Sequence, residues 1–374
     1  MRSMLFVVAS FALTILCWGM YGPVLHHGVQ DMSTGGSLAR MRPFVCVGLA
    51  YFLIGVLVPM AILAMKGEKG TWTVSGIVMS LVAGALGAGG ALGIILALAF
   101  GGDPIFVMPL VFGGAPVVNS FMTIYLAGKM REIGPFFLAG LVMVIMGAVV
   151  VMTCAPQKKK APAAVAAAPA ATADAAAPAA KPTLTSRGTN YALLLGSIAT
   201  AVVCWGAYGP TLHKGQAAMM QSRLRPFICV GMAYFIIAVI VPNLYLAISP
   251  EASEYNFSGT MWSLLAGAAG AFGALGIIMA FNFGGKPVFV MPLIFGGAPV
   301  VSTLITTKVN GLWGEIGAFF LAGLMLVIAG AAMVLVFAPK GHPPAPAPKP
   351  VPEPKPVAEE KTPEAGAGGE AGIA

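Results

Sequence analysis

The chain alternates long apolar segments with short polar gaps. Each apolar segment approaches the roughly 20 residues that a helix needs to cross a hydrocarbon core about 30 Å thick. Five lie in the first half, at 4–22, 44–65, 74–100, 105–127 and 134–153, and five in the second, at 191–209, 227–248, 259–283, 287–307 and 316–337. This pattern predicts an all-α polytopic membrane protein with ten transmembrane helices.

The two halves are copies of one unit. The motif CWGMYGP at 17–23 recurs as CWGAYGP at 204–210. The loop that follows differs slightly in length between the copies, and from RPF (42–44, repeated at 225–227) onward their spacing is constant. Because each copy has an odd number of helices, we expect two inverted five-helix repeats, an arrangement typical of transporters.

Composition divides the chain into four parts. We expect the first repeat at 1–154, a linker at 155–189, the second repeat at 190–339 and a tail at 340–374. The linker is rich in Ala and Pro and cannot bury a core, so we expect it to be flexible. The tail is rich in Pro, Glu and Ala, which predicts disorder.

Charge differences between the copies predict the orientation. The loop 66–69 carries two lysines, whereas the equivalent loop at 249–254 carries two glutamates. A cytoplasmic N-terminus places the more basic loop inside, as the positive-inside rule requires. Arg40, Arg42 and the lysines at 158–160 would then lie outside, against that rule. We predict an inner-membrane protein with both termini in the cytoplasm.

Composition excludes most other classes of protein. Hydrophobic residues make up 58% of the chain and charged residues 9%, against about 25% charged in a soluble domain. The basic residues behind the net charge of +8 are scattered over many loops, so we expect lipid and solute partners and no nucleic acid. We find no metal-ligand cluster, phosphate-binding glycine loop or nucleophile–base pattern, and therefore expect neither a metal, a cofactor nor an enzyme.

The third helix of each copy has a glycine at every third position. These glycines are Gly84, Gly87, Gly90 and Gly93, repeated as Gly267, Gly270, Gly273 and Gly276. Small residues let membrane helices approach closely. A packing seam is the main interpretation, and room for a translocation path is the alternative.

The fourth helix of each copy contains the sequence FGGAP. Proline removes a helical hydrogen bond, and a Gly/Pro interruption at matching positions of two repeats indicates a central transport site. We therefore expect one solute site on the pseudo-twofold axis, although a packing kink is the alternative. Its expected residues in these helices are Phe112, Gly113, Gly114, Pro116 and Asn119, and Phe295, Gly296, Gly297, Pro299 and Ser302.

Two aromatic residues per copy complete the expected site. Trp18 and Tyr21, repeated as Trp205 and Tyr208, are expected to close the first helix just before Gly-Pro. They could form an interfacial aromatic belt or stack against the ring of a solute.

The ten helices, the Trp-Gly pairs at 18–19 and 205–206, and the glycine- and proline-rich third and fourth helices resemble the drug/metabolite transporter superfamily. The glycine-rich fifth helix is similar to its EamA-like and bacterial sugar-uptake branches. This resemblance implies alternating-access transport of a small polar metabolite, such as a sugar, without ATP. The alternative from another class is a non-transporting membrane scaffold that recruits partners through its linker and tail.

Overall fold

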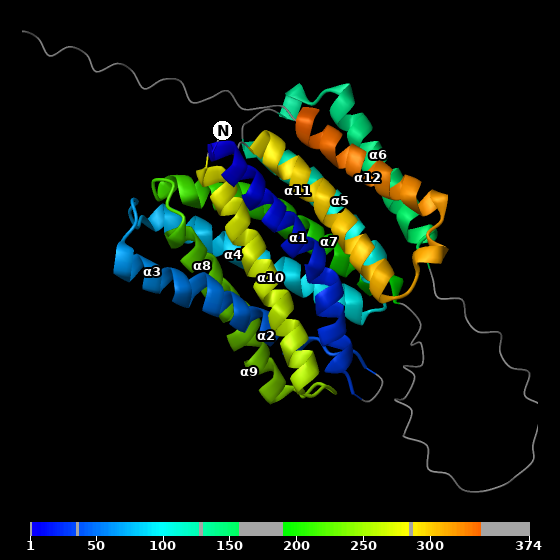
Figure 1. Ribbon diagram of the computed structural model, residues 1–374, viewed down its shortest axis with the longest axis horizontal. Coiled ribbons are helices and arrows are strands. Elements are labelled where there is room, and N and C mark those ends of the chain that lie inside the picture. Colours follow the sequence, from blue (N-terminus) through cyan, green and yellow to red (C-terminus); the bar gives the residue numbers. More distant parts are fainter. Residues whose placement is uncertain (1, 35–36, 127–129, 157–189, 284–286, 338–374) are drawn as a thin grey trace, which may run out of the picture. The chain divides into compact units, whose positions relative to one another are not determined.

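The computed structural model describes residues 2–34, 37–126, 130–156, 190–283 and 287–337. This part of the chain is helical and contains no strand (Figure 1). Its helices are α1 (Arg2–Asp31), α2 (Met41–Phe52), α3 (Val58–Lys66), α4 (Val74–Ala99), α5 (Pro104–Leu126), α6 (Pro135–Thr153), α7 (Tyr191–Ala218), α8 (Leu224–Tyr234), α9 (Val241–Ile248), α10 (Phe257–Asn282), α11 (Pro287–Val309) and α12 (Ala318–Phe337). Most of the predicted linker and all of the predicted tail lie outside the described residues.

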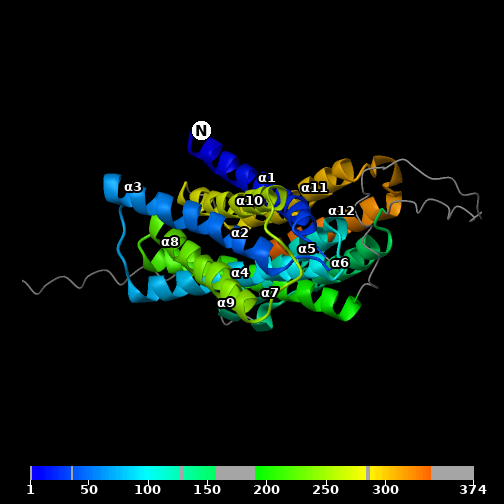
Figure 2. The same cartoon turned by 90° about the horizontal axis from the view of Figure 1, so that it is seen from below.

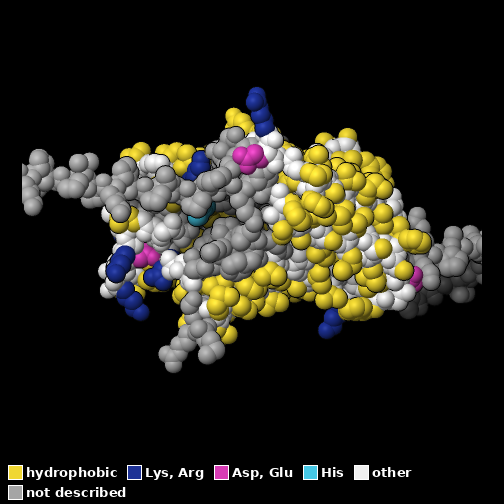
Figure 3. Space-filling view, turned by 90° about the horizontal axis from the view of Figure 1, so that it is seen from above, with side chains coloured by type: hydrophobic (Ala, Val, Ile, Leu, Met, Phe, Trp, Pro, Cys, Tyr) yellow, Lys and Arg dark blue, Asp and Glu magenta, His cyan; other side chains and the backbone are white. Residues whose placement is uncertain are grey.

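Several helical segments are long and apolar enough to cross a membrane. Seven segments of the described chain meet this standard, and three shorter apolar helices lie at Pro135–Val151, Leu293–Val309 and Ala318–Val334. A broad hydrophobic area covers the right side of the view in Figure 3, and most of the charged side chains visible there lie outside it. This is the surface expected of a protein in contact with lipid tails, and we conclude that the chain is a multi-pass membrane protein.

Glycine rows hold the central helices together. On α4, a Cβ at Gly93 would lie 2.8 Å from the Ser197 carbonyl oxygen of α7. On α10, a Cβ at Gly276 would lie 2.7 Å from the Ser10 carbonyl oxygen of α1. Gly84 and Gly267 contact the backbones of α8 and α2 in the same way. The predicted packing seam is confirmed, and it joins the third helix of each copy to the first two helices of the other.

The second helix of each copy is interrupted by a π-helical turn. In the first copy α2 passes through η1 (Leu53–Leu57) into α3, and in the second α8 passes through η3 (Phe235–Ile240) into α9. Each π turn directly precedes a segment with proline in its first turn, Pro59 or Pro242. A proline cannot donate to the carbonyl four residues back, and the wider turn accommodates this loss.

The first helix of each copy is longer than predicted. We expected Gly-Pro to end these helices at residues 22 and 209, but α1 continues to Asp31 and α7 to Ala218. A single proline removes only one helical hydrogen bond, and tight packing against α10 and α4 extends to Gly28 and Gly215. As a result, Trp18 and Trp205 lie in the middle of helices instead of at their ends.

The fourth helices are continuous through their prolines. Pro109 and Pro116 lie inside α5, which runs unbroken from Pro104 to Leu126. The equivalent helix α11 is likewise unbroken from Pro287 to Val309. The expected Gly/Pro interruption is therefore not an unwound segment.

Candidate functional site

Aromatic side chains from both copies line a cavity between the helices. The lining residues are Trp18, Tyr21, Tyr51, Gly87, Trp205, Tyr208, Tyr234, Gly270 and Ala274. They come from α1, α2 and α4 of the first copy and from α7, α8 and α10 of the second. Tyr51 and Tyr234 are equivalent positions of the repeat, as are Gly87 and Gly270. Both copies therefore contribute almost the same set of groups to one cavity.

The two tryptophans are fixed by the glycine rows. The indole nitrogen of Trp18 donates to the Gly270 carbonyl at 3.3 Å, and that of Trp205 donates to the Gly87 carbonyl at 3.2 Å. A Cβ at Gly273 would collide with the Trp18 ring. The glycines thus provide the space for the rings, and the hydrogen bonds hold the indole donors inside a buried region. Their position in the middle of α1 and α7 favours the stacking alternative over an interfacial belt.

The rings form stacked pairs across the two copies. Trp18 and Trp205 stack with ring centroids 6.0 Å apart and planes inclined by 20°. Tyr51 and Tyr234 stack at 3.7 Å with nearly parallel planes. Parallel aromatic faces offer flat, apolar surfaces that suit the face of another ring.

Two buried hydroxyl groups in the lining have no protein partner. Tyr21 is 3% exposed and Tyr208 is 6% exposed, and neither phenol oxygen makes a hydrogen bond within the described chain. A buried, unsatisfied hydroxyl costs roughly 1–3 kcal/mol. Groups kept at such a cost are candidates for binding a polar ligand.

The cavity is small in this structure. Its volume is about 20 Å³, on the measure by which a single water needs roughly 10–15 Å³. This volume is enough for one water molecule and too small for an organic solute. Binding of a solute therefore requires the stacked rings to separate.

The structure brings together part of the expected site. Of the predicted residues, Trp18, Tyr21, Trp205 and Tyr208 line the cavity. Phe112 borders them, with its ring centroid 5.8 Å from that of Trp205, and it also packs against Phe295 at 6.5 Å.

The other predicted residues on α5 and α11 lie away from the cavity lining. Gly113 packs against Val327 of α12, and Gly296 packs against Ile328 of the same helix. Gly114 contacts Val202 of α7, and Gly297 contacts Ile15 of α1. These glycines allow neighbouring helices to pack closely against α5 and α11.

Pro116 and Pro299 are buried and lie one turn beyond the phenylalanines. Asn119 is seven positions beyond Phe112, and Ser302 is seven positions beyond Phe295, which is about 10 Å along a helix. Ser302 is fully buried, and its hydroxyl has no partner within the described chain. Neither Asn119 nor Ser302 lines the cavity.

Sequence reasoning missed Tyr51 and Tyr234 as lining residues. A signal was present, because Ala-Tyr-Phe occurs at 50–52 and again at 233–235 with the spacing of the repeat. Gly87 and Gly270 were identified only as seam positions, with a translocation path as the alternative. They belong to both the seam and the cavity wall.

Comparisons with known proteins agree with a membrane protein of this kind. No family model matches the chain. A protein of Deinococcus radiodurans named "Putative sugar efflux transporter" is 30% identical over 141 residues. The match covers 36% of this chain and only about a third (33%) of that protein.

A solved structure supports the fold. Described only as a crystal structure of a protein, it aligns with 89% of this chain and 97% of its own, with a TM-score of 0.53 and 18% identity. A likeness at this identity concerns the fold alone. The chain thus shares its helical fold with a known structure and a stretch of its sequence with one transport protein.

Proposed function

We propose that this protein is a secondary transporter that moves a small polar organic solute across the membrane by alternating access. The observation that carries the proposal is the aromatic cavity, to which both sequence copies contribute equivalent residues. A site shared between two inverted repeats can be exposed alternately to either side of the membrane. The stretch of sequence shared with the Deinococcus protein is consistent with transport.

The lining favours an uncharged solute that contains a ring. Its side chains carry no formal charge, and an unpaired ion is costly to hold at this depth. The Trp18 and Trp205 faces suit the flat side of a ring, while the Tyr21 and Tyr208 hydroxyls can bond its polar edge. A monosaccharide in its ring form has both features, and we take it as the first solute to test.

The expected residues of α5 and α11 have a supporting role in this proposal. Phe112 packs against both tryptophans, and Phe295 packs against Phe112, so a movement of α5 against α11 would displace the cavity wall. We place both termini in the cytoplasm of a cell whose inner membrane holds the protein, as the charge differences between the copies predict.

A panel of solutes tests the proposal in detergent solution. We expect neutral ring-form sugars to raise the thermal unfolding midpoint of the purified protein, because a ligand that binds only the folded state stabilises it. Acyclic polyols of the same size and charged sugar phosphates are the matched controls and should have smaller effects. If phosphates or polyols stabilise the protein more than sugars do, the assignment of the solute class is wrong.

A non-transporting scaffold makes a different prediction. Such a protein has no need of a cavity that opens, so a cysteine at Ala274 would never react with a polar thiol reagent. A transporter must admit water and solute to this position at some stage of its cycle. Reaction of Ala274→Cys, and its slowing by a stabilising solute, would favour the transporter.

A further inference from the structure

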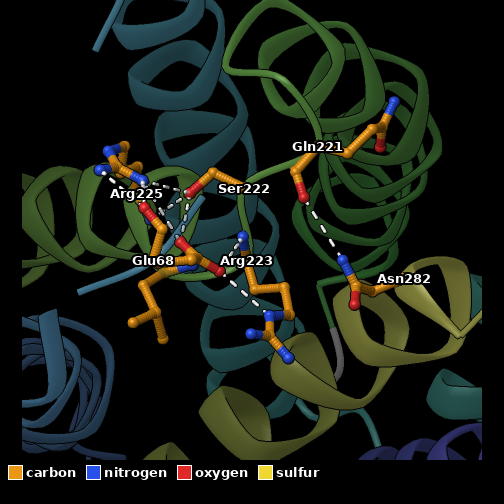
Figure 4. A network of polar contacts seen from close by, with 7 residues as sticks. Glu68, Gln221, Ser222, Arg223, Arg225 and Asn282 are labelled. Carbon is orange, nitrogen blue, oxygen red and sulfur yellow. Dashed lines mark hydrogen bonds and ion pairs between the residues drawn. The ribbon is translucent and has the colours of Figure 1, made fainter. Parts of the chain in front are cut away.

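A buried carboxylate joins the two copies at the start of α8. Glu68, in the loop after α3, accepts hydrogen bonds from the backbone nitrogens of Arg223 (2.8 Å) and Leu224 (3.2 Å) and from the Ser222 hydroxyl. It also pairs with the Arg223 side chain at 3.0 Å, and its own side chain is only 5% exposed (Figure 4). We call this group the Glu68 clamp. The carboxylate satisfies the free N–H groups at a helix N-terminus and opposes the positive end of its dipole.

A second clamp repeats this arrangement at the start of α2. Glu251, in the loop after α9, accepts from the backbone nitrogens of Arg40 (2.8 Å) and Met41 (3.0 Å) and pairs with the Arg40 side chain at 3.1 Å. Glu68 and Glu251 are equivalent positions of the repeat, as are Arg40 and Arg223. We call this group the Glu251 clamp. Each copy therefore caps the second helix of the other copy.

The serine in each clamp comes from a different place in the repeat. Ser222 precedes the capped helix of the second copy, whereas Ser253 follows the capping glutamate. Both hydroxyls donate to the carboxylate, and both accept from an arginine, Arg225 or Arg42. The equivalent positions in the opposite copies are Ala39 and Gly70. The same network is thus built twice from non-equivalent serines, which indicates that the network itself is required.

The two clamps lie at opposite ends of α10. Asn282, at the end of α10, donates to the carbonyl of Gln221 beside the Glu68 clamp (Figure 4). Asn256, just before α10, donates to the carbonyl of Asp31, close to the Glu251 clamp. The 26 residues of α10 span about 39 Å as a helix, enough to cross a membrane. The clamps are therefore separated by the thickness of the bilayer.

Each clamp is connected to the cavity by a short helix. The helix α8 has the Glu68 clamp at its start and Tyr234 of the cavity at its end, and the π turn η3 follows at once. The helix α2 has the same design, with the Glu251 clamp, Tyr51 and then η1. Figure 2 shows α2 and α8 in a view turned by 90° from that of Figure 1. A π turn beside a proline is a natural hinge, so release of a clamp would let its helix swing and separate the Tyr51–Tyr234 pair.

We propose that the Glu68 and Glu251 clamps are the two gates of the cavity, one for each side of the membrane. Both are closed in this structure, in agreement with a cavity too small for a solute. Each half of the transport cycle breaks one clamp and keeps the other. This inference rests on the proposed function, because gates are needed only if a solute passes.

Side-specific labelling tests the gates without any solute. Ala274→Cys, in full-length protein whose native cysteines are all replaced by alanine, is reconstituted in one orientation and treated from either side with a membrane-impermeant thiol reagent. Loss of charge-assisted hydrogen bonds should shift the gate toward open by about ten-fold or more. We expect Glu68→Gln to speed labelling about ten-fold from one side only, and Glu251→Gln from the opposite side only.

Glu254→Gln is the matched control, because it removes a negative charge from an exposed position in the Glu251 loop. It should label like the parent protein. If Glu68→Gln does not fold, Ser222→Ala provides a milder test, since the other copy has alanine at the equivalent position 39. Ser222→Ala should speed labelling from the same side as Glu68→Gln, by a smaller factor.

Three results overturn the gate assignment. These are faster labelling of both glutamine variants from the same side, unchanged labelling of both folded variants, or equal labelling of each from both sides. If solutes slow the labelling of the parent protein while the glutamine variants behave like the parent, transport stands and the gates are wrong. If neither the parent nor any variant reacts from either side, the cavity never opens, and both the transport proposal and the gates fail.

Discussion

At the scale of single residues, the most informative groups are the hydroxyls of Tyr21 and Tyr208. They lie in the cavity lining, are buried and have no protein partner within the described chain. A group that stabilises a ligand and not the fold should show opposite effects on binding and stability when it is removed.

Tyr21→Phe and Tyr208→Phe separate these effects. Each variant should unfold at the same temperature as the parent or be more stable by up to about 1 kcal/mol, since an unsatisfied hydroxyl is lost. Each should bind a stabilising solute about three- to ten-fold more weakly, which is the cost of one hydrogen bond. Thermal unfolding with and without solute measures both, and Tyr255→Phe, in an exposed loop, is the control. Loss of stability with unchanged affinity would show that the hydroxyls serve the fold.

The protonation of Glu68 gives a second test at this scale. Burial alone would raise the pKa of this carboxyl, but the Ser222 hydroxyl, the Arg223 backbone and side chain, and the Leu224 backbone together lower it below the ordinary value. Arg223, directly before α8, and Arg225 of α8 are its ionic partners in the described structure. A lowered pKa means that the clamp stabilises the protein at every pH above the ordinary glutamate value and is lost as pH falls through the lowered one.

We therefore expect a constant difference in stability between the parent and Glu68→Gln from pH 8 to pH 5. It should amount to about 1–2 kcal/mol and should shrink only below about pH 4.3, the ordinary glutamate value. Thermal unfolding of the two proteins across this range measures it. A difference that disappears between pH 7 and pH 5 would instead make Glu68 a carrier of protons at physiological pH.

At the scale of helices, the glycine rows of α4 and α10 determine how closely the copies approach. Replacing Gly90 or Gly273 by leucine places a bulky side chain where the Trp205 or Trp18 ring lies. Overpacking of this kind costs about 1–3 kcal/mol, so both variants should show lower yield and a lower unfolding midpoint. Gly196→Leu on α7 is the control, because nothing lies near its Cβ position. Normal stability of Gly90→Leu would mean that the two helices separate at little cost.

The sequence predicts where helices occur better than it predicts where they end or which other helices they pack against. Apolar runs located α4, α5 and α10 nearly to their observed limits, because span length is dictated by the bilayer. The ends of α1 and α7 were misjudged at Gly-Pro, since packing beyond Pro23 and Pro210 depends on helices distant in sequence.

The candidate site could be predicted only in part. Trp18, Tyr21 and their repeats were identified because they form a conspicuous local motif. Tyr51 and Tyr234 reach the cavity only because α2 and α8 pack side by side. The glutamates of the two clamps follow the constant spacing of the repeat. The serines do not, because Ser222 and Ser253 occupy non-equivalent positions of the two copies. Contacts that break the repeat cannot be derived from the repeat.

At the scale of the whole molecule, two gates on opposite faces require the two copies to be inverted. We expect ten crossings with both termini in the cytoplasm, which places the linker near residue 170 outside. Reporter fusions at residues 170 and 360 should then report opposite sides of the membrane. If both report the same side, the copies are not inverted, and the clamps would not serve opposite faces.

We propose that solute crosses the membrane through the aromatic cavity. Transport of a labelled solute, chosen by its stabilising effect, into vesicles containing Trp18→Phe, Trp205→Phe or the exposed control Trp313→Phe tests it most directly. We predict that the first two variants, which lose the indole donors and part of each ring face, fold normally but lower kcat/KM by about ten-fold or more, a loss of roughly 1.4 kcal/mol, while the control matches the parent. Transport at the parental rate by both Trp18→Phe and Trp205→Phe would show that the solute does not pass between the tryptophans.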